Sequence, residues 1–175
     1  MKRVIEGNLN SKMWITQIFM NHLIGRAEEG EDVNGSVVYV GSMTGKQPLS
    51  RIPAYSAAFA GVQSLTQSYG FIFGRIGIGR VNCVAVGFAP AMQNRAFIFE
   101  PDGETLSVRG EEIINGTATQ RLLDPENIAD AVSSFVDNER SRYCHGTTIM
   151  LSDGYNLVGL PNSSGLKPIN QKQTE

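Results

Sequence analysis

The spacing of hydrophobic residues predicts that helices and strands alternate along this 175-residue chain. From Met1 to about Ile24, apolar residues recur every three or four positions, which is the period of one helix face. Val37–Val40 is apolar at four successive positions, which predicts a strand buried on both faces. The helical period returns from Tyr55 to Phe73. The apolar positions of the two helices are Val4, Ile5, Leu9, Met13, Ile15, Ile18, Phe19 and Leu23, and then Ala58, Val62, Leu65, Tyr69 and Ile72.

The second half of the chain continues the alternation of strands and helices. Arg80–Gly87 and Thr147–Leu151 are predicted to be the second and third strands. One or two short helices are expected within residues 93–120. Asp124 followed by Pro125 predicts a helix start, because Asp caps free backbone N–H groups and Pro suits the first helical position. This order predicts an α/β fold with about three parallel strands and right-handed crossovers.

Length and charge narrow the class of protein further. One domain is expected at residues 1–160, and the polar stretch 161–175 is expected to be a disordered tail. The net charge of −2 gives no electrostatic basis for binding nucleic acid or an anionic membrane. No apolar run approaches the roughly 18 residues of a membrane span, and no signal peptide is recognisable after the N-terminal cations. A cytoplasmic protein is therefore expected.

The cysteines and histidines do not have the spacing of metal ligands. Cys83 and Cys144 form no Cys-x-x-Cys pair, so free thiols are expected in a reducing compartment. His22 and His145 have no carboxylate or thiol at ligand spacing, so both are expected to be structural. No metal site is predicted.

The stretch from Ser42 to Phe59 carries the candidate chemistry. Ser42 follows the first predicted strand, and Tyr55 opens the next helix thirteen positions later. A hydroxyl at a strand end and a phenol in the following helix can converge on one carbonyl group. Taken alone, the pair is also compatible with a loop hydroxyl and an ordinary half-buried tyrosine. The segment resembles the catalytic stretch of short-chain dehydrogenases/reductases, in which Ser is followed by Tyr-x-x-x-Lys, but the lysine position is Phe59 here.

The resemblance extends from about Lys2 to Gly154. It implies that Asn8 corresponds to the active-site Asn of the family, and that Val86, Gly87 and Ala89 lie on the nicotinamide side of the cofactor site. Within the family, the chain resembles the D-mannonate oxidoreductase (fructuronate reductase) branch, which implies a sugar-acid substrate. The segments that carry this closer likeness are Arg51–Ala58, Gln93–Ala96 and Pro101–Leu106.

In the chemistry that the resemblance implies, Tyr55 is the general acid and Ser42 hydrogen-bonds the same carbonyl oxygen while NAD(P)H delivers hydride. A phenol has a pKa of about 10, so the family uses a nearby lysine to favour the phenolate. Phe59 offers no charge. The nearest cations in sequence, Lys46 and Arg51, precede Tyr55 and are not expected to substitute for the missing lysine.

A second departure concerns the cofactor. The family begins with a βαβ unit whose glycine-rich turn holds the pyrophosphate, and no such turn is found in this sequence. The resemblance therefore implies a partial Rossmann-like doubly wound sheet that lacks the N-terminal cofactor-binding half. It also implies NAD(P)(H) as cofactor, although the missing turn argues against binding by this chain alone. Val37–Val40 is then expected to be an uncovered sheet edge.

Three functions remain open from sequence. The chain is an incomplete reductase that is inactive by itself, a non-catalytic paralogue that serves as a dimerisation or packing partner, or a reductase completed in trans by a second chain. Helices 1–24 and 55–73 correspond to those that form the subunit interface in the family. Small residues at Ala57, Ala60 and Gly61 suit close helix contact. A homo-oligomer, or pairing with a complete relative, is therefore expected through these helices.

Overall fold

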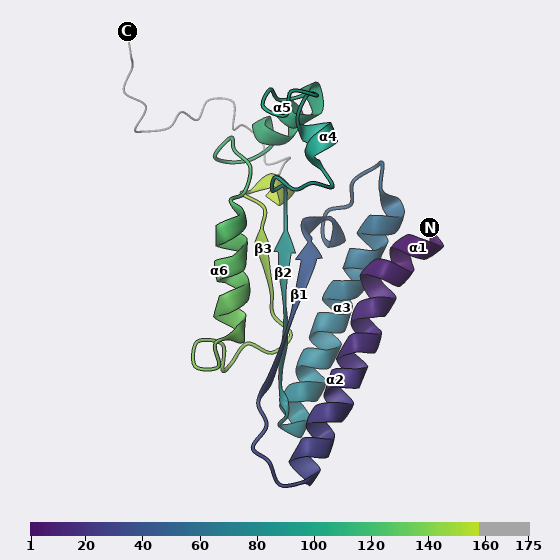
Figure 1. Ribbon diagram of the computed structural model, residues 1–175, viewed down its shortest axis with the longest axis vertical. Helices are drawn as coiled ribbons and strands as arrows, with labels where there is room; N and C mark the ends of the chain where they lie inside the picture. Colours follow the sequence, from purple (N-terminus) through teal and green to yellow (C-terminus); the bar gives the residue numbers. More distant parts are fainter. Residues whose placement is uncertain (158–175) are drawn as a thin grey trace.

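A parallel sheet forms the centre of the computed structural model, which describes residues 1–157 (Figure 1). Among these residues, three strands pair in the order β1-β2-β3. Their bounds are Gly35–Ser42 for β1, Gly79–Val86 for β2 and Thr148–Leu151 for β3. Every residue of β1 pairs with one of β2, from Gly35 opposite Gly79 to Ser42 opposite Val86. The predicted α/β fold with a parallel sheet is confirmed.

The N-terminal helix is longer than predicted and contains a π-helical turn. Helix α1 (Lys2–Ile5) continues through the π turn η1 (Glu6–Asn10) into α2 (Ser11–Glu28). The predicted apolar face is wrong at two positions, since Ile15 is 67% and Ile18 70% exposed. Apolar residues occur on more than one side of α2, and only the side with Met13 and Leu23 faces the core.

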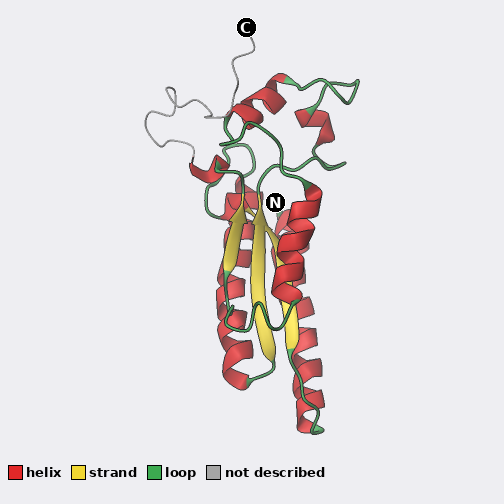
Figure 2. Cartoon of the chain, turned by 90° about the vertical axis from the view of Figure 1, so that its left-hand side faces the viewer, coloured by secondary structure: helices red, strands yellow, loops and turns green. Residues whose placement is uncertain are grey.

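Helix α3 (Pro53–Ile76) lies beside α2 on the same face of the sheet (Figures 1 and 2). It ends at Ile76, and the following Gly77 has a left-handed φ of 76°, which suits the residue after a helix. The predicted core stripe of α3 is correct except at Ile72, which is exposed because Phe73 fills the core instead. A Cβ at Gly61 would lie 2.9 Å from Leu9, so this small residue serves a helix contact within the chain.

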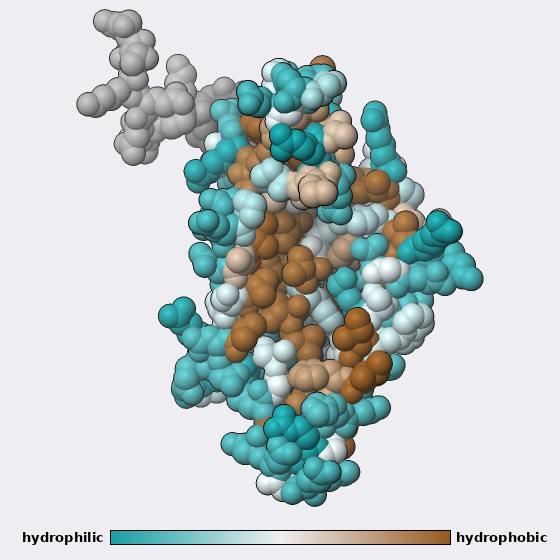
Figure 3. Space-filling model, viewed as in Figure 1, coloured by the Kyte–Doolittle hydropathy of each residue, from teal (hydrophilic) through white to brown (hydrophobic). Residues whose placement is uncertain are grey.

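Strand β1 is less buried than its four apolar residues predict. Val40 is 52% exposed, whereas the central strand β2 is buried from Gly79 to Ala85. Among the described residues only β2 pairs with β1, so one edge of β1 is open, as expected for an uncovered sheet edge. Figure 3 shows apolar side chains gathered over the strands between α6 and α3.

The remaining helices agree with the predicted pattern. Short helices α4 (Arg95–Ile98) and α5 (Val108–Asn115) lie beyond the carboxyl ends of the strands (Figure 1). Helix α6 (Pro125–Val136) covers the sheet face opposite α2 and α3 (Figure 2). Its start is capped as predicted, because the Asp124 carboxylate accepts a hydrogen bond from the Glu126 N–H at 2.9 Å.

Polar contacts hold the loop before β3 against the sheet. The side-chain amide of Asn82 donates to the Cys144 carbonyl at 2.8 Å and its oxygen accepts from the Thr147 N–H at 3.0 Å. Cys83 is a buried free thiol and Cys144 a half-buried one, as expected. Within residues 1–157, no helix is both long and apolar enough to cross a membrane. The tail predicted at 161–175 lies outside the described residues.

Candidate functional site

Ser42 is held in a fixed orientation by Thr44. It is the last residue of β1 and is buried, and its side chain caps the 3-10 turn η2 (Met43–Gly45). The Ser42 Oγ accepts hydrogen bonds from the Thr44 N–H at 3.3 Å and from the Thr44 Oγ1 at 3.0 Å. A hydroxyl has two acceptor positions and one proton to donate. With both acceptor positions used, Ser42 has only its proton left for a third group.

That third group is the phenol of Tyr55. Tyr55 lies in the first turn of α3 and is half-buried. Burial raises the pKa of the Tyr55 phenol above its usual value, and a side-chain hydrogen bond with Ser42 acts in the opposite direction. A hydrogen bond lowers the pKa of a phenol when it is donated to the phenolate. The structure thus brings the side chains of Ser42 and Tyr55 together.

Phe59 packs directly against Tyr55. Their ring centroids are 4.5 Å apart with an interplanar angle of 53°, and Phe59 is only 5% exposed. The position one turn after Tyr55 therefore holds an apolar ring and supplies neither charge nor hydrogen-bond donor. A cation that sequence reasoning missed also lies near this ring, with the Lys12 Nζ 5.5 Å from the Phe59 centroid.

Lys12 comes from the neighbouring helix α2. Burial lowers the pKa of its ammonium, while the Cys83 thiol acts weakly in the opposite direction. The cations nearest to Tyr55 in sequence are Lys46 and Arg51, so proximity along the chain does not indicate Lys12. A usable signal was present, because Lys12 lies four positions after Asn8 and so shares a helix face with it.

Asn8 lies in the π turn η1, which packs against α3. π-Helical turns are rare, and those that do occur are frequently found at functional sites. The Asn8 Nδ2 donates to the Val4 carbonyl at 2.9 Å within its own helix. The structure therefore places Asn8 on the element next to Tyr55, but engages its amide nitrogen locally rather than with Ser42 or Tyr55.

Val86, Gly87 and Ala89 lie at the carboxyl end of β2. Val86 is the register partner of Ser42, so these residues begin beside the hydroxyl pair. The Gly87 N–H donates to the Leu151 carbonyl at 2.6 Å, and a Cβ at Gly87 would lie 2.8 Å from the Cα of Ser152. The Ala89 carbonyl accepts from the Asn94 Nδ2 at 2.8 Å. The segment after β2 is thus held by hydrogen bonds at both of its ends.

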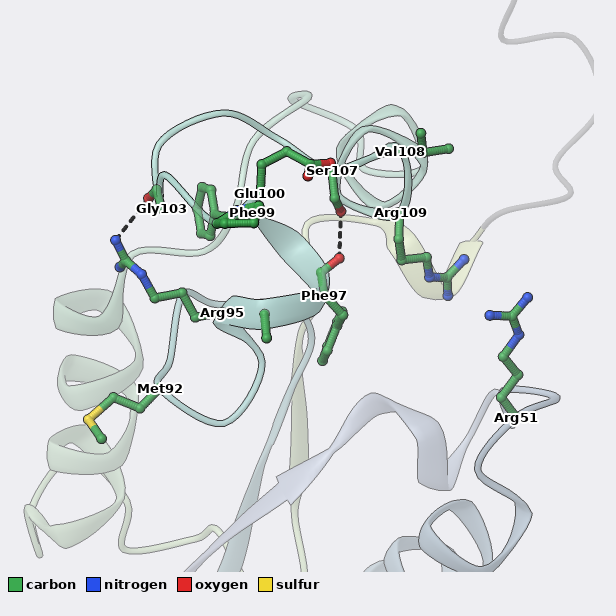
Figure 4. Close-up of a pocket in the computed structure, with 12 residues that line it drawn as sticks. Arg51, Met92, Arg95, Phe97, Phe99, Glu100, Gly103, Ser107, Val108 and Arg109 are labelled. Atoms are coloured by element: carbon green, nitrogen blue, oxygen red, sulfur yellow. Dashed lines mark hydrogen bonds between the residues drawn. The ribbon is translucent and has the colours of Figure 1, made fainter.

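A hollow of about 930 Å³ lies between α4, α5 and the loop before α3 (Figure 4). Three arginines line it. Arg95 donates to the Gly103 carbonyl at 2.8 Å, and Arg109 pairs with Glu112 at 2.8 Å. Arg51 forms no ion pair with any residue that the structure describes. Figure 4 shows Arg51 and Arg109 extending toward each other from opposite sides of the hollow. The hollow thus carries positive charge, and one of its arginines, Arg51, lies four residues before Tyr55 in sequence.

The chain has relatives among oxidoreductases. An uncharacterized oxidoreductase of Schizosaccharomyces pombe is 34% identical over 160 residues, which cover 90% of this chain and 54% of the relative. One of Haemophilus influenzae is 29% identical over 140 residues, which cover 80% of this chain and 46% of the relative. The chain therefore spans about half the length of the curated relatives it matches.

A solved structure shares the architecture. The crystal structure of a "putative D-Mannonate oxidoreductase" from Haemophilus influenzae, with bound NAD, superposes with a TM-score of 0.65 at 27% identity. The superposition covers 75% of this chain and 46% of the other. The sequence model of the family described as short chain dehydrogenase matches residues 1–97. Because that match spans more than half of the sequence, the chain belongs to the short chain dehydrogenase family.

Proposed function

We propose that this chain carries the reacting residues of an NAD(P)-dependent oxidoreductase that interconverts a carbonyl and an alcohol on a sugar acid. The observation that carries the proposal is the approach of the Ser42 side chain to the Tyr55 phenol at the carboxyl end of β1, where Ser42 opposes the rise that burial causes in the pKa of the phenol. Ligands of open α/β sheets bind at this end of the strands.

A nicotinamide, when bound, would supply or accept the hydride at the substrate carbon. In the reducing direction, Tyr55 transfers its phenolic proton to the carbonyl oxygen, which becomes the alcohol. Ser42 donates a hydrogen bond to the same oxygen and stabilises the charge that develops there. Thr44 occupies the acceptor positions of Ser42 and so directs the Ser42 proton toward the reacting oxygen. In the oxidising direction, the Tyr55 phenolate accepts the proton of the alcohol.

The described residues fit one end of the cofactor. Val86, Gly87 and Ala89 would face the nicotinamide, because they start at the strand end beside Ser42. The missing side chain at Gly87 allows the close approach to Ser152 that brings the ends of β2 and β3 together. No described strand leads into a glycine-rich turn that could hold the pyrophosphate. Binding of the whole dinucleotide is therefore proposed for the protein of which these residues form the reacting part.

The arginine-lined hollow supports a sugar acid as substrate. Arginine binds carboxylates through two parallel hydrogen bonds, and Arg51 has no carboxylate partner among the described residues. Arg51 and Arg109 would hold the carboxylate while the sugar carbon chain extends toward Tyr55. The likeness to the "putative D-Mannonate oxidoreductase" structure points to the same substrate class.

The test is a spectrophotometric assay of the protein with NAD or NADP and D-mannonate, and with the corresponding ketone in reverse. The variant Tyr55→Phe should lower kcat by at least about 100-fold, because it removes the general acid. Tyr143→Phe is the matched control, since Tyr143 is 87% exposed and should leave the rate unchanged. Full activity in Tyr55→Phe, or no nucleotide-dependent turnover of sugar acids by the unmodified protein, would contradict the proposal.

A role as a packing partner is the second candidate. The observation in its favour is a set of exposed apolar or small residues on the two helices, namely Trp14, Ile15 and Ile18 of α2 and Ala57 and Ala60 of α3. We propose that this side packs against a second copy or a complete relative. Sedimentation analysis of the protein distinguishes the cases. A monomer at micromolar concentration rejects the self-association, whereas a dimer that Trp14→Glu dissociates supports it.

A further inference from the structure

Lys12 and Tyr55 both contact the aromatic ring of Phe59. The Lys12 Nζ is 5.5 Å from the Phe59 centroid, and that centroid is 4.5 Å from the Tyr55 ring. The ammonium is therefore within about 10 Å of the Tyr55 ring, a separation over which a unit charge still acts strongly in a partly buried site. Lys12 has no carboxylate partner among residues 1–157, so its charge is not neutralised locally.

The packing of the two helices explains why Lys12 reaches this place. Leu9 of η1 contacts Gly61 of α3, where an added Cβ would be only 2.9 Å away. This close approach lets the long Lys12 side chain cross from α2 to the ring of Phe59. The contact between the ammonium and the ring face is a cation–π interaction, which holds the cation by about 0.5–2 kcal/mol.

We infer that Lys12 is a positioning residue for Tyr55, supplying from the neighbouring helix the positive charge that Phe59 cannot supply. Burial raises the pKa of Tyr55, and on this inference the Lys12 charge limits that rise, because a nearby cation favours the phenolate over the phenol. The purpose of this charge rests on the proposed function. The electrostatic coupling between Lys12 and Tyr55 can be measured without any turnover.

Other groups near the pair do not supply this charge. From β2, Cys83 is a thiol whose pKa burial raises to about 11, so it is neutral near pH 7. From β1, Ser42 contributes a hydrogen bond and no charge. Lys46 follows η2 and is exposed, and Arg51 lines the hollow near α5. Phe59 itself is uncharged. Lys12 is therefore the cation that the described geometry associates with the Phe59 and Tyr55 rings.

The test measures the phenol directly, without nucleotide or substrate. A fluorinated tyrosine incorporated at position 55 is more acidic than tyrosine, so it ionises at a lower pH than the other tyrosines of the chain. Its phenolate absorbance then reports the pKa of this one group. Lys12→Met keeps the apolar part of the side chain and removes the charge, so the pKa should rise by about half a unit to one unit. Lys12→Arg and the exposed control Lys46→Met should leave it within about 0.2 unit.

A charge-relocation variant completes the test. Lys12→Met combined with Phe59→Lys should return the phenol pKa to within about 0.3 unit of the starting protein. Far-ultraviolet circular dichroism verifies folding, and Lys12→Gln replaces Lys12→Met if the latter does not fold. An unchanged pKa in the neutral variants, or an equal rise in Lys46→Met, overturns the inference. An inactive protein with a Lys12-dependent phenol pKa would reject the proposed function alone.

Discussion

Ser42 and Val86 are register partners at the carboxyl ends of β1 and β2. This pairing places the hydroxyl that orients Tyr55 next to the strand end from which the proposed nicotinamide side of the site begins. The two residues are separated by a whole helix in sequence, and the parallel register alone brings them together. The pairing of the strands therefore positions the candidate site, and side chains from the neighbouring elements complete it.

Thr44→Val is expected to lower kcat by about tenfold, because it removes a hydrogen bond to Ser42 worth about 1 kcal/mol and frees Ser42 to rotate. Valine has the shape of threonine, so the packing of this buried residue is kept. The control is Thr44→Ser, which retains the hydroxyl and should keep most of the rate. Equal rates for the Val and Ser variants in a steady-state assay would show that Thr44 does not orient Ser42.

Arg51→Gln is expected to raise KM for a sugar acid by about 10- to 100-fold, the loss that follows removal of a charged hydrogen-bond donor. For an uncharged analogue such as the corresponding amide, KM should change little. Arg75→Gln is the matched control, because Arg75 is an exposed arginine at the other end of α3. An equal increase in KM for the acid and the amide would rule out carboxylate recognition by Arg51.

Tyr39 makes stability depend on alkaline pH. Its hydroxyl bonds the Thr16 Oγ1 at 2.6 Å, and burial raises its pKa to about 12 from a usual value of 10. Because the folded-state pKa is the higher one, the protonated phenol stabilises the fold fully below pH 10. This contribution is lost as the pH rises from 10 to 12, by roughly 2 kcal/mol.

Urea unfolding at a series of pH values tests this dependence. Tyr39→Phe should be less stable than the unmodified protein at pH 7, because Thr16 loses its buried partner. It should also show a smaller loss of unfolding free energy between pH 10 and 12. Parallel pH profiles for the two proteins would show that Tyr39 is not the titrating group.

Local patterns predicted the elements of this fold well. The period of apolar residues indicates α3, and Asp124 with Pro125 indicates the start of α6, because both signals act within one turn of helix. Val40 was misjudged for a different reason. Four apolar residues in succession indicate that a strand prefers to be buried. Whether another element covers Val40, however, depends on segments that are distant in sequence.

The residues of the candidate site also differ in whether the local sequence could identify them. Ser42 and Tyr55 could be found from sequence because a strand end and a helix start bring them together over a short loop. Lys12 could not be found in the same manner, since it reaches Phe59 from a helix on the far side of β1 in sequence. The hollow around Arg51 and Arg109 likewise joins segments on either side of β2.

The contact between Leu9 and Gly61 fixes the distance between two helix axes, and on the proposed role of Lys12 it also sets the strength of the electric field at the Tyr55 oxygen. A single methyl group at position 61 would lie 2.9 Å from the terminal carbons of Leu9, so the Leu9 side chain would have to shift and the packing beside Lys12 would change. On the proposed role of Lys12, the acidity of the reacting phenol therefore depends on the packing of a residue that never meets substrate.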